Sequence, residues 1–263
     1  MTSIVDFLQL LLGIAGLWYG SETLIKGAMS LADRYRLSDA LFGMLVLAIG
    51  TDLPALFVAV DASFRSLAGE DLSGIVIGSA IGSTFGLFAL VFGVAGFIGY
   101  EPMNRRFLPR NTFFLAGGII AVFLFSLDGR ISRLEGVLLI LYYAAYLTVL
   151  ILRRVEIDGN DGVVVHRPAW RAWLTLALGL VILLVAAELT VVYAAEFARE
   201  VGLSNIAVSA IVIGMGSSLP ELSVSFVALL RKRAGLSVGN LIGSNVLDTL
   251  LVPGVAAVIS PLI

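Results

Sequence analysis

Long apolar segments separated by short polar ones dominate this sequence. Several of them reach the roughly 20 apolar residues with which an α-helix spans a bilayer. Apolar and polar side chains do not alternate at every second position, so a transmembrane β-barrel is not expected. The pattern predicts eight transmembrane helices, at about 4–32, 38–62, 72–98, 112–127, 134–152, 172–198, 206–230 and 238–260.

The composition agrees with an all-α membrane protein embedded in a lipid bilayer. Of 263 residues, 59% are hydrophobic and 14% are charged, and the mean hydropathy is +1.01. The first apolar run lacks a basic start and continues into Glu22 and Lys26, which argues against a cleaved signal peptide. The chain has no cysteine, which excludes disulfides and thiolate metal sites. A net charge of −2 gives no reason to expect a nucleic-acid partner, and the lone His166 lies in a polar linker.

Basic residues between the predicted spans indicate the orientation of the chain. Twelve arginines and lysines follow the odd-numbered spans, whereas four lie in the alternate loops. Because cytoplasmic loops of membrane proteins are enriched in Lys and Arg, the odd-numbered loops are predicted to be cytoplasmic. The N-terminus is then outside, in a multi-pass protein of the cell (inner) membrane.

The chain also repeats itself, which bears directly on its fold. The phrase LSDALFGMLVLAIGTDLPA from Leu37 matches LSNIAVSAIVIGMGSSLPE from Leu203 at a constant offset of 166 residues. A second pair, GSAIGSTFGLFALVFG and GNLIGSNVLDTLLVPG, starts at Gly78 and Gly239 with an offset of 161. Two matched blocks in the same order indicate a duplication.

The position of the linker makes the two copies inverted. Five predicted spans precede it, and an odd number of spans reverses the membrane polarity of the second copy, as in many secondary transporters. We therefore predict a first inverted repeat at 1–152 with its motif at 41–93, a cytoplasmic linker at 153–170, and a second repeat at 171–263 with its motif at 206–254.

Each copy carries a proline that interrupts its second helix. Proline removes one helical hydrogen bond and disturbs the carbonyl four residues earlier, so Pro54 would free the carbonyl of Gly50 and Pro220 that of Gly216. A freed carbonyl within the membrane needs a partner, and a bound cation is one. The neighbouring side chains all offer oxygen, which suits Na⁺ and Ca²⁺: Thr51, Asp52, Ser217, Ser218 and Glu221.

A Gly-Ser helix follows in each copy. Its glycines recur every four residues and predict close helix approach, at Gly78 and Gly82 and at Gly239 and Gly243. The second glycine of each pair is followed by Ser83 or Ser244, and Asp248 lies one turn beyond Ser244 on the same face. Buried acids within a membrane are functional candidates by default, and a structural ion pair is the alternative for Glu221 and Asp248.

Other acids have simpler explanations. Asp61 lies near the end of its span, where its side chain can reach water. Glu22 and Glu188 occupy matching positions in the two copies, and they either support the site or only pair with nearby cations.

These motifs resemble the two alpha repeats of the sodium/calcium exchanger family of calcium/cation antiporters. The resemblance rests on GTDLPA with GSAIGSTFGL and on GSSLPE with GNLIGSNVLD, and it extends over nearly the whole chain. It implies two inverted sets of five helices around cation sites at mid-membrane. Carried over by position, the expected donors are Thr51, Ser83, Ser217, Ser218, Glu221, Ser244 and Asp248.

The sequence departs from the family pattern in its first repeat and at its end. Ala55 stands where the family has Glu, Leu87 where it has Asn or Asp, and Asp52 where it has Ser. We predict that Asp52 replaces the acid missing at Ala55. The counterparts of the family's last two helices are not in the chain, which favours either a short natural variant or an incomplete reading frame.

Together these features predict an all-α, inverted-repeat membrane protein of about eight helices (5+3). It would be no enzyme and would need no prosthetic group. It would exchange Ca²⁺ for Na⁺ or H⁺ by alternating access; its oligomeric state is left open. A degenerate, non-transporting member of the fold is the main alternative. An intramembrane aspartyl protease using Asp52 and Asp248 is a third, and neither acid has the Gly-x-Gly-Asp context of such enzymes.

Overall fold

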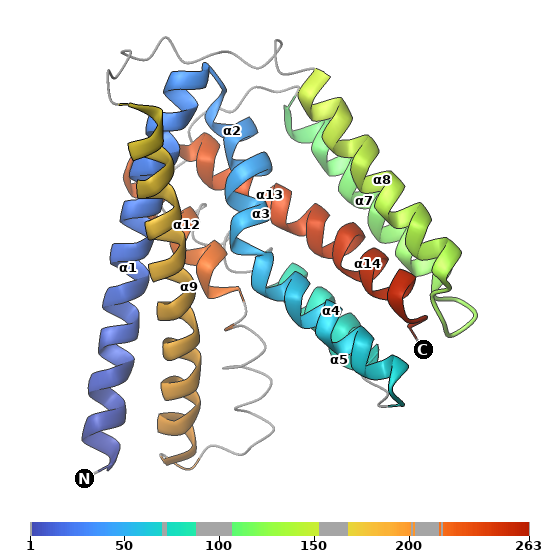
Figure 1. The fold of residues 1–263 in the computed structure, drawn as a ribbon, viewed down its shortest axis with the longest axis horizontal. Helices are drawn as coiled ribbons and strands as arrows, with labels where there is room; N and C mark the ends of the chain where they lie inside the picture. Colours follow the sequence, from blue (N-terminus) through green and yellow to red (C-terminus); the bar gives the residue numbers. More distant parts are fainter. Residues whose placement is uncertain are drawn as a thin grey trace.

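The computed structural model describes residues 2–69, 73–87, 107–152, 168–200, 202, 216 and 218–262. These residues are almost entirely helical (Figure 1). The elements are α1 (Thr2–Tyr35), α2 (Asp39–Phe42), the π-helix η1 (Gly43–Leu47), α3 (Ala48–Thr51), α4 (Leu53–Leu67), α5 (Ser73–Gly86), α7 (Phe107–Phe125), α8 (Arg133–Leu152), α9 (Ala169–Glu200), α12 (Leu219–Leu230), α13 (Ala234–Val246), the π-helix η5 (Leu247–Leu251) and α14 (Val252–Ile259).

The helices confirm the predicted all-α membrane fold. Within the described residues, four helical segments are long and apolar enough to cross a membrane, and a bent pair from α2 to α4 makes a fifth. Helices α7 and α12 are shorter apolar helices. The predicted spans 72–98 and 206–230 lie partly outside the described residues, as does most of the predicted linker.

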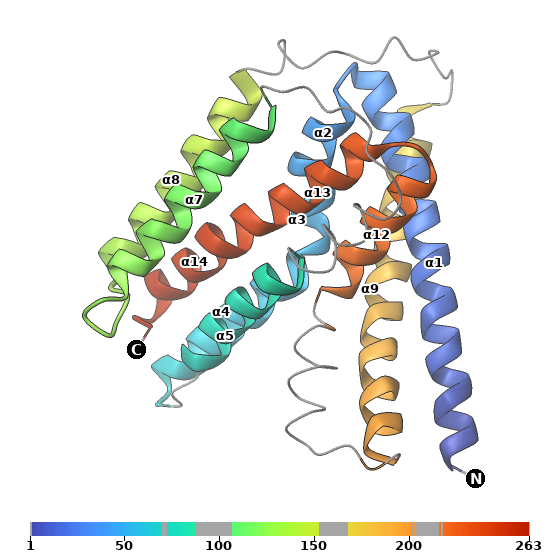
Figure 2. The ribbon, with the colours of Figure 1, turned by 180° about the vertical axis from the view of Figure 1, so that it is seen from behind.

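Helices α1 and α9 form a long antiparallel pair (Figures 1 and 2). A Cβ atom at Gly20 would lie 2.6 Å from the backbone nitrogen of Leu183, and one at Gly27 would lie 2.6 Å from that of Leu176. Only glycine allows such an approach of two backbones. At 1.5 Å per residue the helices are about 50 Å long, so both extend beyond a hydrocarbon core of about 30 Å.

The remaining helices pack around the continuous segment α13–η5–α14. Helix α8 meets α14 where Gly136 faces Gly254, since a Cβ at Gly136 would lie 2.8 Å from the Gly254 carbonyl oxygen. On the other side, Gly243 packs against Met44 and Ala48. Among the described residues, a Cβ at Gly78 or Gly82 would meet no atom within 4 Å, so the close approach predicted for the first copy's glycines is not seen there.

The first copy bends at its proline motif, and the second copy has nearly the same local backbone there. The chain turns by 45° between α3 and α4 at Asp52, whose backbone has φ −86° and ψ −3°. Its counterpart Ser218 precedes α12 with φ −97° and ψ 7°. Each residue is followed by Leu-Pro, and the proline lies in the first turn of the next helix, where its missing N–H costs no hydrogen bond. The duplicated sequence thus produces the same backbone turn twice.

Candidate cation site

The first group of predicted donors lies where the bend of the first repeat meets the start of α12. Asp52 is 3% exposed and Glu221 is 2% exposed. Their carboxyl groups lie close enough to interact electrostatically, although they come from different repeats. Thr51 lies near Glu221, and its hydroxyl donates to the Ala48 carbonyl at 3.3 Å. The two proline motifs therefore face each other through their polar side chains.

A second group joins α5 to η5. The Ser83 hydroxyl donates to Oδ2 of Asp248 at 2.5 Å, and the Ser218 hydroxyl donates to Oγ of Ser83 at 3.3 Å. Asp248 is 1% exposed and lies in the π-helix η5, a wider turn that is frequent at functional sites. Again the contacts cross between the two repeats.

Ser244 lies between the groups. It is fully buried beside Asp52, but its hydroxyl makes no well-aligned hydrogen bond to any described residue. Ser217, the remaining predicted donor, lies outside the described residues. The structure thus brings seven of the eight predicted donors into one buried region, at 7% exposure or less: Thr51, Asp52, Ser83, Ser218, Glu221, Ser244 and Asp248.

The three acids are close enough to repel one another, and no ion pair to them is found in the described residues. Asp248 lies within electrostatic range of both Asp52 and Glu221. Oδ2 of Asp52 and Oε2 of Glu221 have no hydrogen-bond partner among the described residues. No three acidic side chains in the described part converge tightly enough to hold one metal ion by themselves. A cation here would be held by one or two carboxylates together with hydroxyl and carbonyl oxygens.

Comparison with known proteins shows the family. A profile described as "Sodium/calcium exchanger protein" matches residues 5–152 and 171–263. The chain belongs to the sodium/calcium exchanger family. It is 32% identical to an uncharacterised membrane protein of Methanocaldococcus jannaschii, covering 90% of this chain and 76% of that protein. It is 25% identical to the sodium/calcium exchanger MaX1 of Methanosarcina acetivorans, covering 98% and 84%.

A solved structure of the sodium-calcium exchanger NCX_Mj shares the fold. It superposes with a TM-score of 0.82 at 30% identity, over 99% of this chain and 84% of that one. That protein was soaked with Na⁺ and Sr²⁺. This chain is therefore a member of a transporter family with the exchanger fold, and the resemblance predicted from its motifs is confirmed.

The departures from the exchanger pattern have different consequences. Leu87 is 1% exposed and packs with Leu241 and the partly buried Leu222, so the first-repeat counterpart of Asp248 is an apolar contact. Ala55 is partly buried, one turn beyond the bend. Asp52 supplies the first repeat's only acid in this buried region of the described residues, and its replacement of the acid missing at Ala55 stays a prediction.

Three other acids that the sequence pointed to, Asp61, Glu188 and Glu22, lie outside this region. Asp61 and Glu188 are exposed. Glu22 pairs with Lys26 at 3.1 Å and also with Arg231, which comes from the turn after α12. Glu22 therefore pairs both locally and across the repeats.

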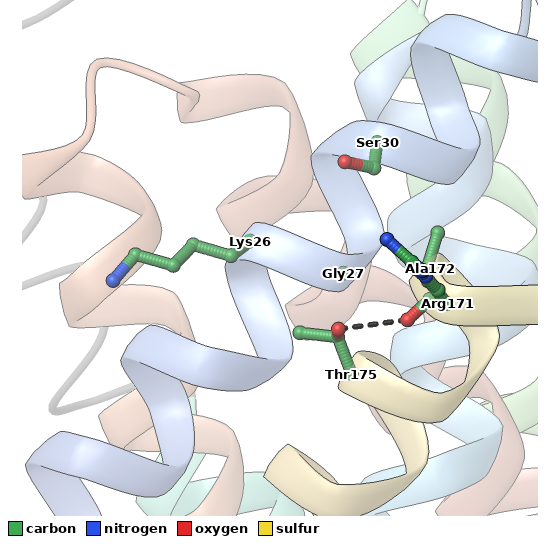
Figure 3. Close-up of a pocket in the computed structure, with 6 residues that line it drawn as sticks. All are labelled: Lys26, Gly27, Ser30, Arg171, Ala172 and Thr175. Carbon is green, nitrogen blue, oxygen red and sulfur yellow. Dashed lines mark hydrogen bonds between the residues drawn. The ribbon is translucent and has the colours of Figure 1, made fainter. Parts of the chain in front are cut away.

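A pocket of about 350 Å³ lies elsewhere, between α1 and the start of α9 (Figure 3). Lys26 and Arg171 line it, and Thr175 donates its hydroxyl hydrogen bond to the Arg171 carbonyl at 2.8 Å. Figure 3 shows Lys26 extending away from Arg171. The basic lining makes this pocket unsuitable for a cation.

Sequence reasoning missed some buried polar residues near the site. Asn240 is fully buried and donates through Nδ2 to Oγ of Ser225 at 3.3 Å and to the Glu221 carbonyl at 3.4 Å. A signal was present, since Asn240 stands one turn before Ser244 and Ser225 one turn after Glu221. The polar spacing along both helices could have identified them.

Proposed function

We propose that this exchanger-family protein is a secondary active antiporter that moves Ca²⁺ in exchange for Na⁺ or H⁺ by alternating access. The main observation is the meeting of Asp52 with Glu221, two buried carboxyl groups from opposite repeats. Hydroxyl and carboxylate oxygens, without sulfur or imidazole, are the ligands that Na⁺ and Ca²⁺ prefer. The proposed ligands are Thr51, Asp52, Ser83, Ser217, Ser218, Glu221, Ser244 and Asp248.

The negative charge of the same groups explains why Ca²⁺ and a counter-ion would compete for the site. Three buried carboxylates in a low-dielectric region need positive charge nearby, because an unpaired buried charge is strongly unfavourable. Ca²⁺, Na⁺ ions or protons can each supply that charge, so they compete for one set of oxygens. Two carboxylates buried close together repel each other unless one of them takes up a proton, which makes H⁺ a chemically reasonable competitor.

Alternating exposure of the cation site to the two sides of the membrane would involve both repeats. Asp52 and Ser83 come from the first repeat, whereas Glu221 and Asp248 come from the second. A movement of one repeat against the other changes the geometry of every contact between them. Ion binding would therefore be coupled to the change of access.

The test is ⁴⁵Ca²⁺ uptake into proteoliposomes, driven in turn by an outward Na⁺ gradient and by a pH gradient. We expect uptake with at least one gradient, no uptake without a gradient, and none with Glu221→Gln. Uptake that ignores both gradients and survives Glu221→Gln would overturn the proposal. Absence of uptake in the intact protein would instead favour the non-transporting alternative.

A further inference from the structure

A stripe of polar side chains runs along α13 from Asp248 toward the turn after α12. Ser237, Asn240, Ser244 and Asp248 follow one another at spacings of three and four residues, which places them on one helix face. All four are 1% exposed or less. A buried apolar face would be expected for a helix packed on all sides, so this polar stripe calls for an explanation.

A matching stripe on α12 faces it. Ser218, Glu221 and Ser225 are also three and four residues apart and are 2% exposed or less. The hydrogen bond between Asn240 and Ser225 at 3.3 Å joins the two stripes one turn beyond Glu221. The polar surface thus continues past the candidate cation site toward one end of the molecule.

Several atoms of this surface lack partners. Oγ of Ser237, Oδ1 of Asn240 and Oγ of Ser244 are buried and have no hydrogen-bond partner among the described residues. Most buried polar groups in proteins are paired, and unpaired ones are unfavourable. Unpaired oxygens in a row suit a surface that becomes hydrated in another state of the protein.

The stripe ends at a cluster of ion pairs. Ser237 lies one turn from Arg233, whose carbonyl accepts the Ser237 backbone N–H at 3.4 Å. Nη1 of Arg233 donates to both carboxylate oxygens of Asp39 at 3.0 and 3.1 Å. Nη2 donates to both of Asp33 at 3.0 and 3.2 Å. The guanidinium therefore links the α12–α13 turn to the end of α1 and the start of α2.

The contact that α2 and η1 make with α13 beside the stripe is tightly packed. A Cβ at Gly239 would overlap the Ala40 carbonyl, and one at Gly43 would lie 2.6 Å from the Leu236 carbonyl oxygen. The α2–α13 contact therefore leaves no room beside the stripe. Arg233 and its two aspartates close the same end and are only 12–16% exposed.

We propose that the stripe Ser237–Asn240–Ser244 with Ser225 lines the route of the cation between the site and the predicted cytoplasmic end, and that Arg233 closes this route. The inference rests on the proposed function for the identity of the ion. When Arg233 moves away, the carboxylates of Asp33 and Asp39 are left unpaired at the cytoplasmic end of the route. Their negative charge attracts a hydrated cation. With Arg233 in place, most of that charge is neutralised and the helices are held together.

The test uses single cysteines, because the chain has none of its own. Ser237→Cys and Asn240→Cys are compared with Leu236→Cys, which is equally buried but packs in the apolar cluster with α1 and α9. A charged, membrane-impermeant methanethiosulfonate reagent is applied from each side. In an Arg233→Gln background we expect labelling of the first two to rise by at least about tenfold from one side only, with Leu236→Cys unchanged.

Two further variants, Arg233→Lys and Asp39→Asn, separate the loss of the ion pairs from a failure of Arg233→Gln to fold. Arg233→Lys keeps the charge but not the paired geometry, so its labelling should lie between the intact protein and Arg233→Gln. Asp39→Asn breaks the same cluster without removing the cation and should also raise labelling, which covers a failure of Arg233→Gln to fold. The proposed route is overturned if Arg233→Gln raises the labelling of Leu236→Cys as much as that of Ser237→Cys and Asn240→Cys. It is also overturned if neither Arg233→Gln nor Asp39→Asn raises the labelling of Ser237→Cys and Asn240→Cys.

The labelling does not depend on transport, so the two proposals fail separately. Side-specific labelling of the stripe without any ⁴⁵Ca²⁺ exchange would support the route and reject the antiport. Exchange with a stripe that never labels would support the antiport and reject the route.

Discussion

The charge of Asp52 is the most informative target, because this residue stands where the exchanger pattern has serine and its neighbour Ala55 lacks the usual acid. We expect Asp52→Asn to weaken Ca²⁺ binding strongly. Asp52 is 3% exposed and lies within electrostatic range of Glu221, so its charge acts on any ion held between the two repeats. The change keeps the size of the side chain and removes only the charge.

The magnitude follows from the burial. At an effective dielectric constant of about 20, two unit charges about 4 Å apart interact by about 4 kcal/mol, so a divalent ion loses about 8 kcal/mol of attraction. Roughly half is offset, because three close carboxylates would hold a proton in the empty site, and an ion binding to the variant no longer has to displace it. A net loss of about 4 kcal/mol raises the Kd for Ca²⁺ about a thousandfold. The offset belongs to the empty site and is the same for either ion, so for Na⁺, which loses about 4 kcal/mol of attraction, the Kd should change little.

Calorimetric titration of the purified protein with Ca²⁺ and with Na⁺ measures both values. Asp61→Asn is the matched control, since it removes an exposed acid further along the same helix, and it should change either Kd by less than about threefold. A second pair of variants tests whether Asp52 replaces the acid missing at Ala55. Asp52→Ser should lose Ca²⁺ binding, and Asp52→Ser with Ala55→Glu should recover it. Unchanged Ca²⁺ affinity in Asp52→Asn, or an equal loss in Asp61→Asn, refutes the reasoning.

Three other predictions address the second repeat, the topology and the packing. Glu221→Gln and Asp248→Asn should each abolish or strongly weaken Ca²⁺ binding, because a divalent ion in a low-dielectric site needs about two carboxylates; unchanged calorimetric affinity in both variants moves the site elsewhere. Cysteines at Ser132 and Asn160 should label from opposite sides of the membrane, and labelling from one side contradicts the inverted arrangement. Gly239→Ala should lower the stability by about 1–3 kcal/mol because its Cβ meets the Ala40 backbone, whereas Gly78→Ala should not; equal thermal melting shifts would contradict this packing.

Much of the fold followed from the sequence because its signals are local. Apolar length predicted the helices, and the Leu-Pro motif predicted an interruption in each copy, where Asp52 and Ser218 have nearly the same backbone angles. The constant offsets revealed the duplication without any knowledge of packing. Glycine spacing was a weaker guide, since the predicted close contact is found at Gly239, whereas Gly78 has none with a described residue. Small residues permit an approach, but the neighbouring helix decides whether it happens.

The contacts of the candidate site were predictable only in part. The motifs identified the donors, but the partner of each donor depends on tertiary packing between residues more than 130 positions apart. Arg233 is the clearest example. In the sequence it is one of three adjacent basic residues in a loop, which indicates only a cytoplasmic location. Its pairing with Asp33 and Asp39 appears only once α1, α2 and α13 are brought together.

The unequal charge of the two repeats has a structural consequence. The second repeat contributes two buried acids to the site and the first contributes one, and each acid of the second repeat contacts a polar residue of the first: Glu221 meets Asp52, and Asp248 meets Ser83. Neither repeat therefore holds a complete set of partners by itself. If the repeats move against each other, these contacts change together with the ion that neutralises them. A ligand shifts such an equilibrium only through its different affinity for the two states, and contacts that cross between the moving parts supply that difference. Loss of the acid at position 55 is compatible with this coupling because Asp52 retains a charged contact on the first-repeat side.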